Sequence, residues 1–181
     1  LRCNDTYTLR NGSSCVFLGI QFSRSRQEET DVDGDTISNK TSIPIPILKL
    51  DKGCKIRLYY CSINGTNLPF VKDKTNGIEV HTESEAFVTD CEIKGLNSDG
   101  VQIVDGKMVI NNSNIMDNTG VGIYGNKNGR LVLTNSRVKD NKSYGIYLQG
   151  KCFRALMEKN IIVSNGKGQV RYDKDVRVLN E

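Results

Sequence analysis

The sequence predicts an all-β fold: a single-stranded right-handed parallel β-helix, which is a solenoid of about six to seven coils. Three observations predict it: a repeat of about 23 residues, short strand-like segments in each repeat, and Gly or Asn between those segments. An α-helix does not fit, because the segments are β-branched and are broken by turn residues. Leucine-rich repeats have a similar period, but their LxxLxLxxN motif is absent.

The repeat is visible in a recurring glycine-led segment. Gly145 begins Gly-Ile-Tyr-Leu, Gly122 begins a similar segment 23 residues earlier, Gly100 lies 22 residues before that, and Gly77 another 23. A second apolar set, the anchor of each coil, keeps the same step: Ile93, Ile115, Val138 and Ile161. Because every coil repeats in register, neighbouring strands must be parallel and about 4.8 Å apart.

Each coil contains pairs of apolar residues with a period of two, which predicts side chains that point into the core. Leu131 and Leu133, seven and five residues before Val138, are one such pair. Their counterparts are Ile56 and Leu58, Ala86 and Val88, and Met108 and Ile110. Residues three before the anchor tolerate positive φ and predict a bend between two sheets: Gly19, Asp90, Asn112 and Asn135. Cys61 and Cys91, two before their anchors, are expected to stack and to face the core.

Two longer steps predict insertions. Ile63 precedes Ile93 by 30 residues, and Phe22 precedes Ile63 by 41, so the repeat is interrupted around 64–75 and at 23–43. The second interruption is polar and is expected to be a loop. Residues 1–181 are therefore expected to form one β-helix domain with a loop insertion at 23–43. Since the chain starts at Leu1 and not at methionine, we expect it to be part of a longer protein.

Composition excludes several classes of function. The net charge of +4 is spread along the chain without a basic cluster, which argues against a nucleic-acid partner. There is also no apolar run long enough for a membrane span. The six cysteines form no Cys/His cluster, so neither a metal site nor a cofactor is expected. They are interpreted as free thiols in a reducing compartment, which favours an intracellular location. An acidic stretch near Asp33 lacks the glutamate of a calcium loop, since Ser42 occupies its place.

The segments 112–118 (Asn-Ser-Asn-Ile-Met-Asp-Asn) and 145–148 (Gly-Ile-Tyr-Leu) resemble the repeats of the pectin-lyase-like, right-handed parallel β-helix superfamily. The resemblance covers about 44–172 and, by extension, 5–22. It implies the fold but not one function. The superfamily includes polysaccharide lyases, hydrolases and epimerases, viral and phage structural proteins, and non-catalytic interaction domains.

Residue chemistry argues against a polysaccharide-cleaving enzyme. Glycosidases need a pair of carboxylates, but Glu79 is the one acidic residue among the expected outward positions of the glycine-led sheet. His81 is interpreted as a surface residue, and Asp99 and Asp105 as turn residues, so no catalytic residue is assigned. Tyr124 and Tyr147 should stack as an outward aromatic platform, which suits a sugar ring, a partner side chain or a simple cross-strand pair.

A second face predicts an interaction surface. Residues six before the anchor should point outward because they alternate with the core pairs, and five of the six are apolar. An apolar outer strip usually marks a contact surface. The predicted surface comprises Val16, Leu18, Tyr59, Phe87, Val109, Val132, Ala155 and Met157. The sequence thus favours a non-catalytic scaffold or protein-interaction module that binds a protein or another domain of its parent chain. A carbohydrate-active or sugar-binding domain and a viral or phage structural β-helix are the alternatives.

Overall fold

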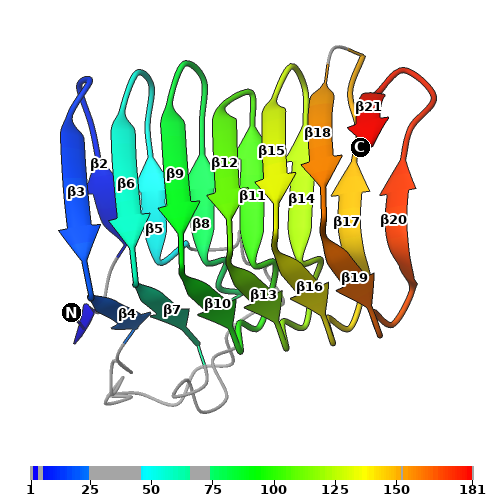
Figure 1. Ribbon diagram of the computed structural model, residues 1–181. Coiled ribbons are helices and arrows are strands. Elements are labelled where there is room, and N and C mark those ends of the chain that lie inside the picture. Colours follow the sequence, from blue (N-terminus) through cyan, green and yellow to red (C-terminus); the bar gives the residue numbers. More distant parts are fainter. Residues whose placement is uncertain (1, 4–5, 25–45, 66–73, 152, 181) are drawn as a thin grey trace, which may run out of the picture.

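The computed structural model describes residues 2–3, 6–24, 46–65, 74–151 and 153–180. Within these ranges the chain forms 21 strands and no helix, arranged as three seven-stranded parallel sheets (Figure 1). None of the described segments is a long apolar helix of the kind that crosses a membrane. The predicted all-β parallel β-helix is confirmed.

We name the three sheets A, B and C. Sheet A consists of β1 (Arg2–Cys3), β4 (Gln21–Arg24), β7 (Ser62–Asn64), β10 (Glu92–Lys94), β13 (Asn114–Met116), β16 (Arg137–Lys139) and β19 (Ile161–Val163). Sheet B consists of β2 (Tyr7–Leu9), β5 (Leu48–Leu50), β8 (Ile78–Val80), β11 (Val101–Val104), β14 (Ile123–Asn126), β17 (Tyr144–Leu148) and β20 (Gly168–Tyr172). Sheet C consists of β3 (Ser14–Leu18), β6 (Lys55–Tyr59), β9 (Glu85–Thr89), β12 (Lys107–Asn111), β15 (Arg130–Thr134), β18 (Arg154–Glu158) and β21 (Arg177–Asn180).

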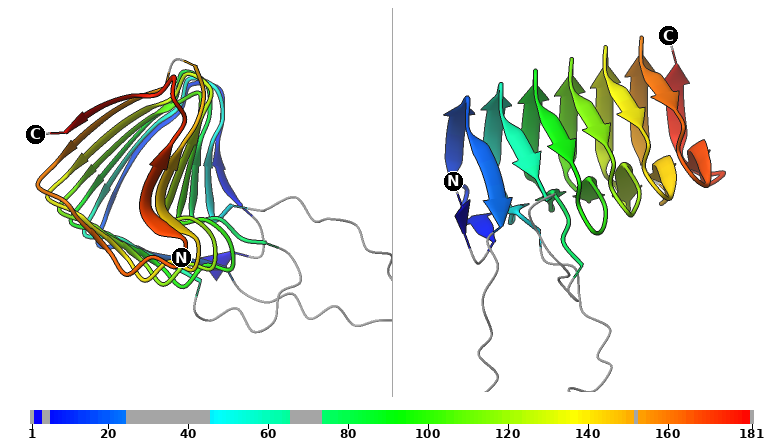
Figure 2. Two further views of the ribbon diagram at one scale, coloured as in Figure 1. Left: turned by 90° about the vertical axis from the view of Figure 1, so that its right-hand side faces the viewer. Right: turned by 90° about the horizontal axis from the view of Figure 1, so that it is seen from below.

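Each coil runs through sheet B, then sheet C, then sheet A. Six complete coils, from β2–β4 to β17–β19, are followed by the partial coil of β20 and β21. Seen along the axis, the sheets form the sides of a roughly triangular tube, with the two termini at opposite ends of the solenoid (Figures 1 and 2). Every outer face therefore carries rows of side chains that run along the axis, one residue from each coil.

The core consists of the inward side chains of the three sheets. The predicted inward pairs of sheet C, such as Ile56 and Leu58, are at most 1% exposed. The predicted anchors Ile63, Ile93, Ile115 and Val138 pair with one another in sheet A. The alternation of buried and partly exposed residues along β6, β9 and β12 confirms the period of two.

The bend between sheets C and A uses left-handed backbone conformations. Gly19, Asp90, Asn112 and Asn135 have φ between 47° and 64°, as predicted. Tyr60 stands at the same bend with a φ of 54°, although tyrosine does not favour this conformation. The geometry of the coil therefore overrides the preference of that residue.

A ladder of hydrogen bonds holds this corner together. The backbone N–H of Cys61 donates to Sγ of Cys91 at 3.3 Å, and the N–H of Cys91 donates to Oγ of Ser113 at 3.0 Å. Ser113 and Ser136 continue the ladder at 3.1 Å, and Asn160 completes it at 2.9 Å from the N–H of Ser136. The predicted stacking of Cys61 and Cys91 against the core is confirmed, since they are 3% and 5% exposed.

The sixth coil corrects the predicted repeat. Val138 pairs with Ile162, one residue after the predicted anchor Ile161. The extra residue lies in the turn before β18, where Phe153 is fully buried. Its ring occupies the space that a Cβ on Gly125 or Gly129 would need.

This one-residue shift exchanges the two faces of β18. Ala155 pairs with Leu131 and Met157 pairs with Leu133, so both face the core and are only 3% and 8% exposed. The prediction that Ala155 and Met157 belong to an outer surface is therefore wrong. Leu156 takes the outward position instead, beside Val132.

The two predicted insertions fall mainly outside the described residues. Strand β4 runs to Arg24, so the regular coil continues two residues into the range predicted as a loop. The rest of 23–43 and most of 64–75 lie in the undescribed ranges 25–45 and 66–73. The single-domain organisation with a loop at 23–43 stays a prediction.

Candidate interaction surfaces

An apolar row crosses the whole outer face of sheet C. Its members occupy matched positions in all seven strands, and six of the seven are apolar. The apolar row comprises Val16, Arg57, Phe87, Val109, Val132, Leu156 and Leu179. A β-helix places its core residues inside, so the fold itself does not require such a row.

Exposure along the apolar row is highest at its ends. Val16 is 62% exposed and Leu179 is 65% exposed, whereas the members between them are partly shielded by their neighbours. Arg57 is the one charged member of the apolar row, and its guanidinium carbon lies 5.1 Å from the ring centroid of Phe87. The aliphatic stem of an arginine covers apolar surface, and a cation–π contact fixes its head, so the surface remains continuous.

The other predicted members of this surface differ in position. Leu18 and Tyr59 pair at the margin of the face, and Leu18 is 68% exposed. Leu156 and Leu179 belong to the apolar row but were not predicted, because the register of the last two coils was displaced. Asn160, which lies 24 residues after its ladder neighbour Ser136, carries the sequence signal of this displacement.

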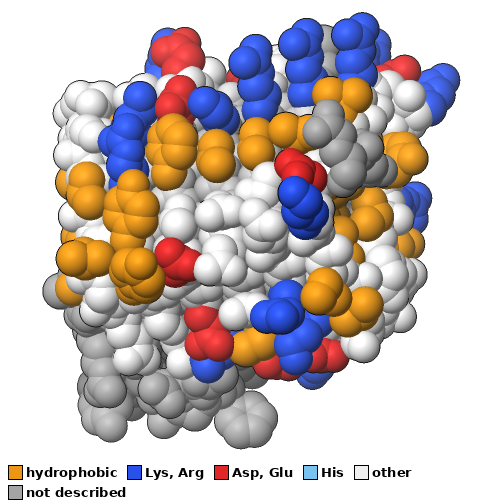
Figure 3. Space-filling view, viewed as in Figure 1, with side chains coloured by type: hydrophobic (Ala, Val, Ile, Leu, Met, Phe, Trp, Pro, Cys, Tyr) orange, Lys and Arg blue, Asp and Glu red, His pale blue; other side chains and the backbone are white. Residues whose placement is uncertain are grey.

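A charged row flanks the apolar row on the same face. From β6 to β21 it occupies the position two residues earlier in each strand and comprises Lys55, Glu85, Lys107, Arg130, Arg154 and Arg177. Figure 3 shows this line of basic side chains above the line of hydrophobic ones. Glu85 lies 3.3 Å from Lys55 and 3.9 Å from Lys107, so the negative charge of the row is at its N-terminal half.

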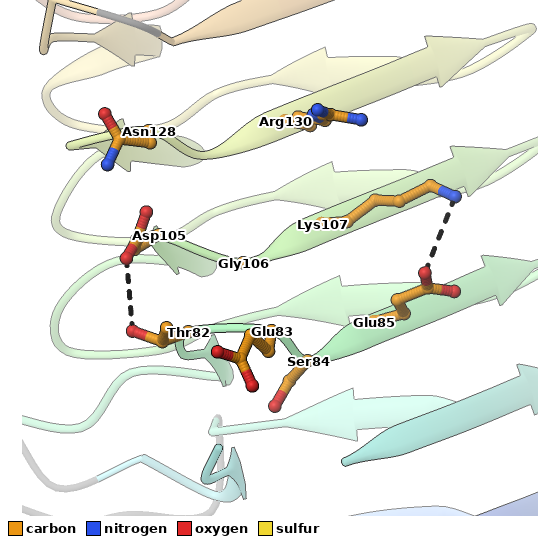
Figure 4. A pocket seen from close by; sticks show the side chains of 9 residues that line it. All are labelled: Thr82, Glu83, Ser84, Glu85, Asp105, Gly106, Lys107, Asn128 and Arg130. Atoms are coloured by element: carbon orange, nitrogen blue, oxygen red, sulfur yellow. Dashed lines mark hydrogen bonds and ion pairs between the residues drawn. The ribbon is translucent and has the colours of Figure 1, made fainter. Parts of the chain in front are cut away.

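A pocket adjoins the charged row where the turns lead from sheet B into sheet C (Figure 4). Its lining comprises Thr82, Glu83, Ser84, Glu85, Asp105, Gly106, Lys107, Asn128 and Arg130. Thr82 Oγ1 donates to Asp105 Oδ2 at 3.2 Å. In Figure 4, Lys107 extends toward Glu85, whereas no interaction joins Arg130 to the other residues drawn.

The outer face of sheet B carries the predicted aromatic platform. Tyr124 and Tyr147 occupy matched positions, with ring centroids 5.8 Å apart and planes inclined by 60°. Tyr144, which the sequence did not suggest, lies 5.7 Å from Tyr147. The guanidinium of Arg171 lies 5.1 Å from the Tyr147 ring and donates to the Tyr144 hydroxyl at 3.0 Å. Gln149 Nε2 also donates to the Tyr124 hydroxyl. The rings are therefore tilted and partly occupied by contacts within the chain.

Acidic residues in sheet B and in the turn before it are held by hydrogen bonds. Glu79 accepts from Asn76 Nδ2 at 2.9 Å and lies 3.2 Å from His81 Nε2. Asp99 accepts from the N–H of Val121 at 2.7 Å and from the side chain of Gln102 at 2.9 Å. Burial raises the pKa of Asp99, which these hydrogen bonds partly oppose. Asp99 thus joins two coils at a turn. Among the described residues, no group of three or more His, Cys, Asp or Glu is placed to hold a metal ion.

Comparison with known proteins agrees with this geometry. The family model described as the right-handed beta helix region matches residues 18–180. The chain belongs to this right-handed β-helix family, in agreement with the superfamily resemblance of its repeats. No curated protein and no solved structure matches the sequence.

Proposed function

We propose that the chain is a non-catalytic protein-interaction module, which binds another protein or another domain of its parent chain through the outer face of sheet C. The observation that carries the proposal is the apolar row, which continues through every strand of that sheet. Its side chains alternate with the core residues and contribute nothing to the packing of the core. Contiguous apolar surface on a soluble fold is characteristic of contact sites.

Phe87 is the expected anchor of this interface. It lies near the middle of the apolar row, partly exposed, with Arg57 and Lys107 at 5.1 Å and 5.5 Å from its ring centroid. Aromatic residues and arginine dominate the energy of protein interfaces. A partner that covers the ring would also desolvate the two cation–π contacts, and these contacts strengthen when water is removed.

The acidic residues of sheet B favour a non-catalytic role. General acid–base catalysis needs a carboxyl group that reaches the substrate. Glu79 and Asp99 instead accept hydrogen bonds from Asn76, Val121 and Gln102, which are contacts that stabilise the coils.

Photo-crosslinking tests the proposal. Benzoylphenylalanine is placed at Val132 on sheet C and, as the control, at Tyr147 on sheet B, in full-length protein in cells of its source. We expect a protein adduct of defined mass from Val132 alone. A further Phe87→Asp/Leu156→Asp change should abolish it while circular dichroism shows an intact β-helix. Equal adducts from both positions, or an adduct that survives the double change, would contradict the proposal.

The second candidate function is sugar binding on sheet B. The cluster of Tyr124, Tyr144 and Tyr147 favours it, because exposed aromatic rings stack on sugar rings and Arg171 could pair with a uronate carboxylate. A glycan array that includes uronide polymers tests this function. Binding at low micromolar concentration that Tyr124→Ala/Tyr147→Ala abolishes would favour it over the protein-interaction module.

A further inference from the structure

Three arginines stand in register on consecutive strands of sheet C. Arg130 pairs with Arg154, and Arg154 pairs with Arg177, so the three side chains leave the same face in one line. Adjacent strands are about 4.8 Å apart, and like charges directly opposite one another destabilise a sheet. The fold therefore carries an unfavourable arrangement that its own packing does not require.

Nothing in the described part of the chain neutralises these arginines. Lys55 and Lys107, earlier in the charged row, both lie within 4 Å of Glu85, at 3.3 Å and 3.9 Å. Among the described residues no carboxylate forms an ion pair with Arg130, Arg154 or Arg177, and each of the three is exposed. The C-terminal half of the charged row is thus a line of unpaired cations beside Val132, Leu156 and Leu179 of the apolar row.

The spacing of the two rows indicates the shape of a partner that matches both. From Lys107 to Arg177 there are three strand steps, or about 14 Å at 4.8 Å each. Three turns of an α-helix span about 16 Å, and a helix presents side chains on one flank once per turn. An extended strand presents a side chain on one face only every second residue, so three successive side chains beyond the first on that face span about 20 Å. The spacing of the rows thus differs from that of a helix by about 2 Å and from that of a strand by about 6 Å. Flexible arginine side chains accommodate the smaller mismatch more readily, which favours a helix.

We propose that the outer face of sheet C binds an acidic amphipathic helix, which lies along the solenoid axis. The apolar stripe of this helix would cover Val132 and Leu156, and carboxylates on one flank, one per turn, would pair with Arg130, Arg154 and Arg177. The inference rests on the proposed function and specifies the chemistry of the partner. Charge complementarity would relieve the repulsion within the line of arginines and would fix the register of the complex.

A displayed peptide library tests the inference. Peptides of about 18 residues, or five helical turns, carry a fixed leucine stripe and flanks randomised among Glu, Lys, Gln and Ala. A parallel library has Gln in place of the stripe. Selections use the wild-type chain, the test variant Arg130→Glu/Arg154→Glu, and the control variant Lys142→Glu/Lys167→Glu. The control changes the net charge equally at exposed turns away from sheet C.

We expect the wild-type chain and the control variant to enrich Glu on one flank of the leucine stripe, and the test variant to enrich Lys there. The best wild-type peptide should bind the test variant about tenfold more weakly, because two ion pairs become repulsive. Enrichment of uncharged flanks, an equal change in the control variant, or equal selection of peptides without leucine would overturn the inference. The last result would indicate a general polyanion site. If the wild-type chain enriches no peptide, the inference also fails, whereas the proposed function is judged separately by the crosslinking experiment at Val132.

Discussion

The corner between sheets C and A depends on single buried atoms that accept backbone N–H groups. Cys91 Sγ accepts from Cys61, while the next two coils use a serine oxygen at the same place. Cys91→Ser should therefore keep the ladder, with a free energy of unfolding within about 1 kcal/mol of the wild type. Cys91→Val leaves the N–H of Cys61 without an acceptor and should lower the free energy of unfolding by about 1–3 kcal/mol. Urea denaturation measures both, and equal losses would show that the ladder contributes nothing.

The same thiol has a pH signature. Burial raises the pKa of Cys91 from 9.0 to about 11, because the charged thiolate is poorly solvated there. Below pH 9.0 both the folded and the unfolded chain hold the proton, and between pH 9.0 and about 11 the unfolded chain loses it first. The contribution of this thiol to stability is thus complete below pH 9.0 and is lost as the pH rises toward 11. Cys91→Ser should lose less stability than the wild type over that interval in urea titrations; identical losses would contradict the assignment.

Among the structural elements, the turn after β16 depends on a ladder of buried asparagines. Asn141 Oδ1 accepts from Asn118 Nδ2 at 2.9 Å, and Asn141 Nδ2 donates to Asn165 Oδ1 at 2.9 Å. Asn141→Ala removes both bonds and leaves buried amides unsatisfied, so the free energy of unfolding should fall by about 2–4 kcal/mol. The exposed Asn128→Ala is the control and should change it by less than about 0.5 kcal/mol. Urea denaturation measures the free energy of unfolding of both variants. Similar losses in Asn141→Ala and Asn128→Ala would exclude a special role for the asparagine ladder.

The turn before β18 shows where element prediction from the sequence fails. The middle coils, from β8 to β17, repeat after 22 or 23 residues, and their inward pairs could be predicted from that step alone. One extra residue in the turn that buries Phe153 moves every later side chain to the opposite face, so Ala155 and Met157 were misplaced. A turn can absorb such a residue without any change in composition, so the step of the apolar residues does not reveal it. Its trace in the sequence is the 24-residue spacing from Ser136 to Asn160.

For the whole molecule, the repeat predicted the fold, the number of coils and most of the apolar row. Val16, Leu18, Tyr59, Phe87, Val109 and Val132 face outward as predicted. The line of arginines could not be predicted, because Arg154 lies 24 residues after Arg130 and aligns with it only once the sixth coil is in register. The contacts around Tyr147 also depend on neighbouring coils, and Arg171 reaches it from the next strand of sheet B.

The most direct test of the account compares the two outer faces in one binding measurement. The dissociation constant for the protein crosslinked at Val132 is measured with the wild-type chain, with Phe87→Asp/Val132→Asp on sheet C, and with Tyr124→Ala/Tyr147→Ala on sheet B. Both double variants should fold, since the changed side chains are partly exposed and lie outside the core, and a substitution at such a strand position costs about 1 kcal/mol. We predict that the sheet C variant weakens binding about 100-fold or more and that the sheet B variant binds like the wild type. Retained affinity in the sheet C variant, together with lost affinity in the sheet B variant, would contradict the account.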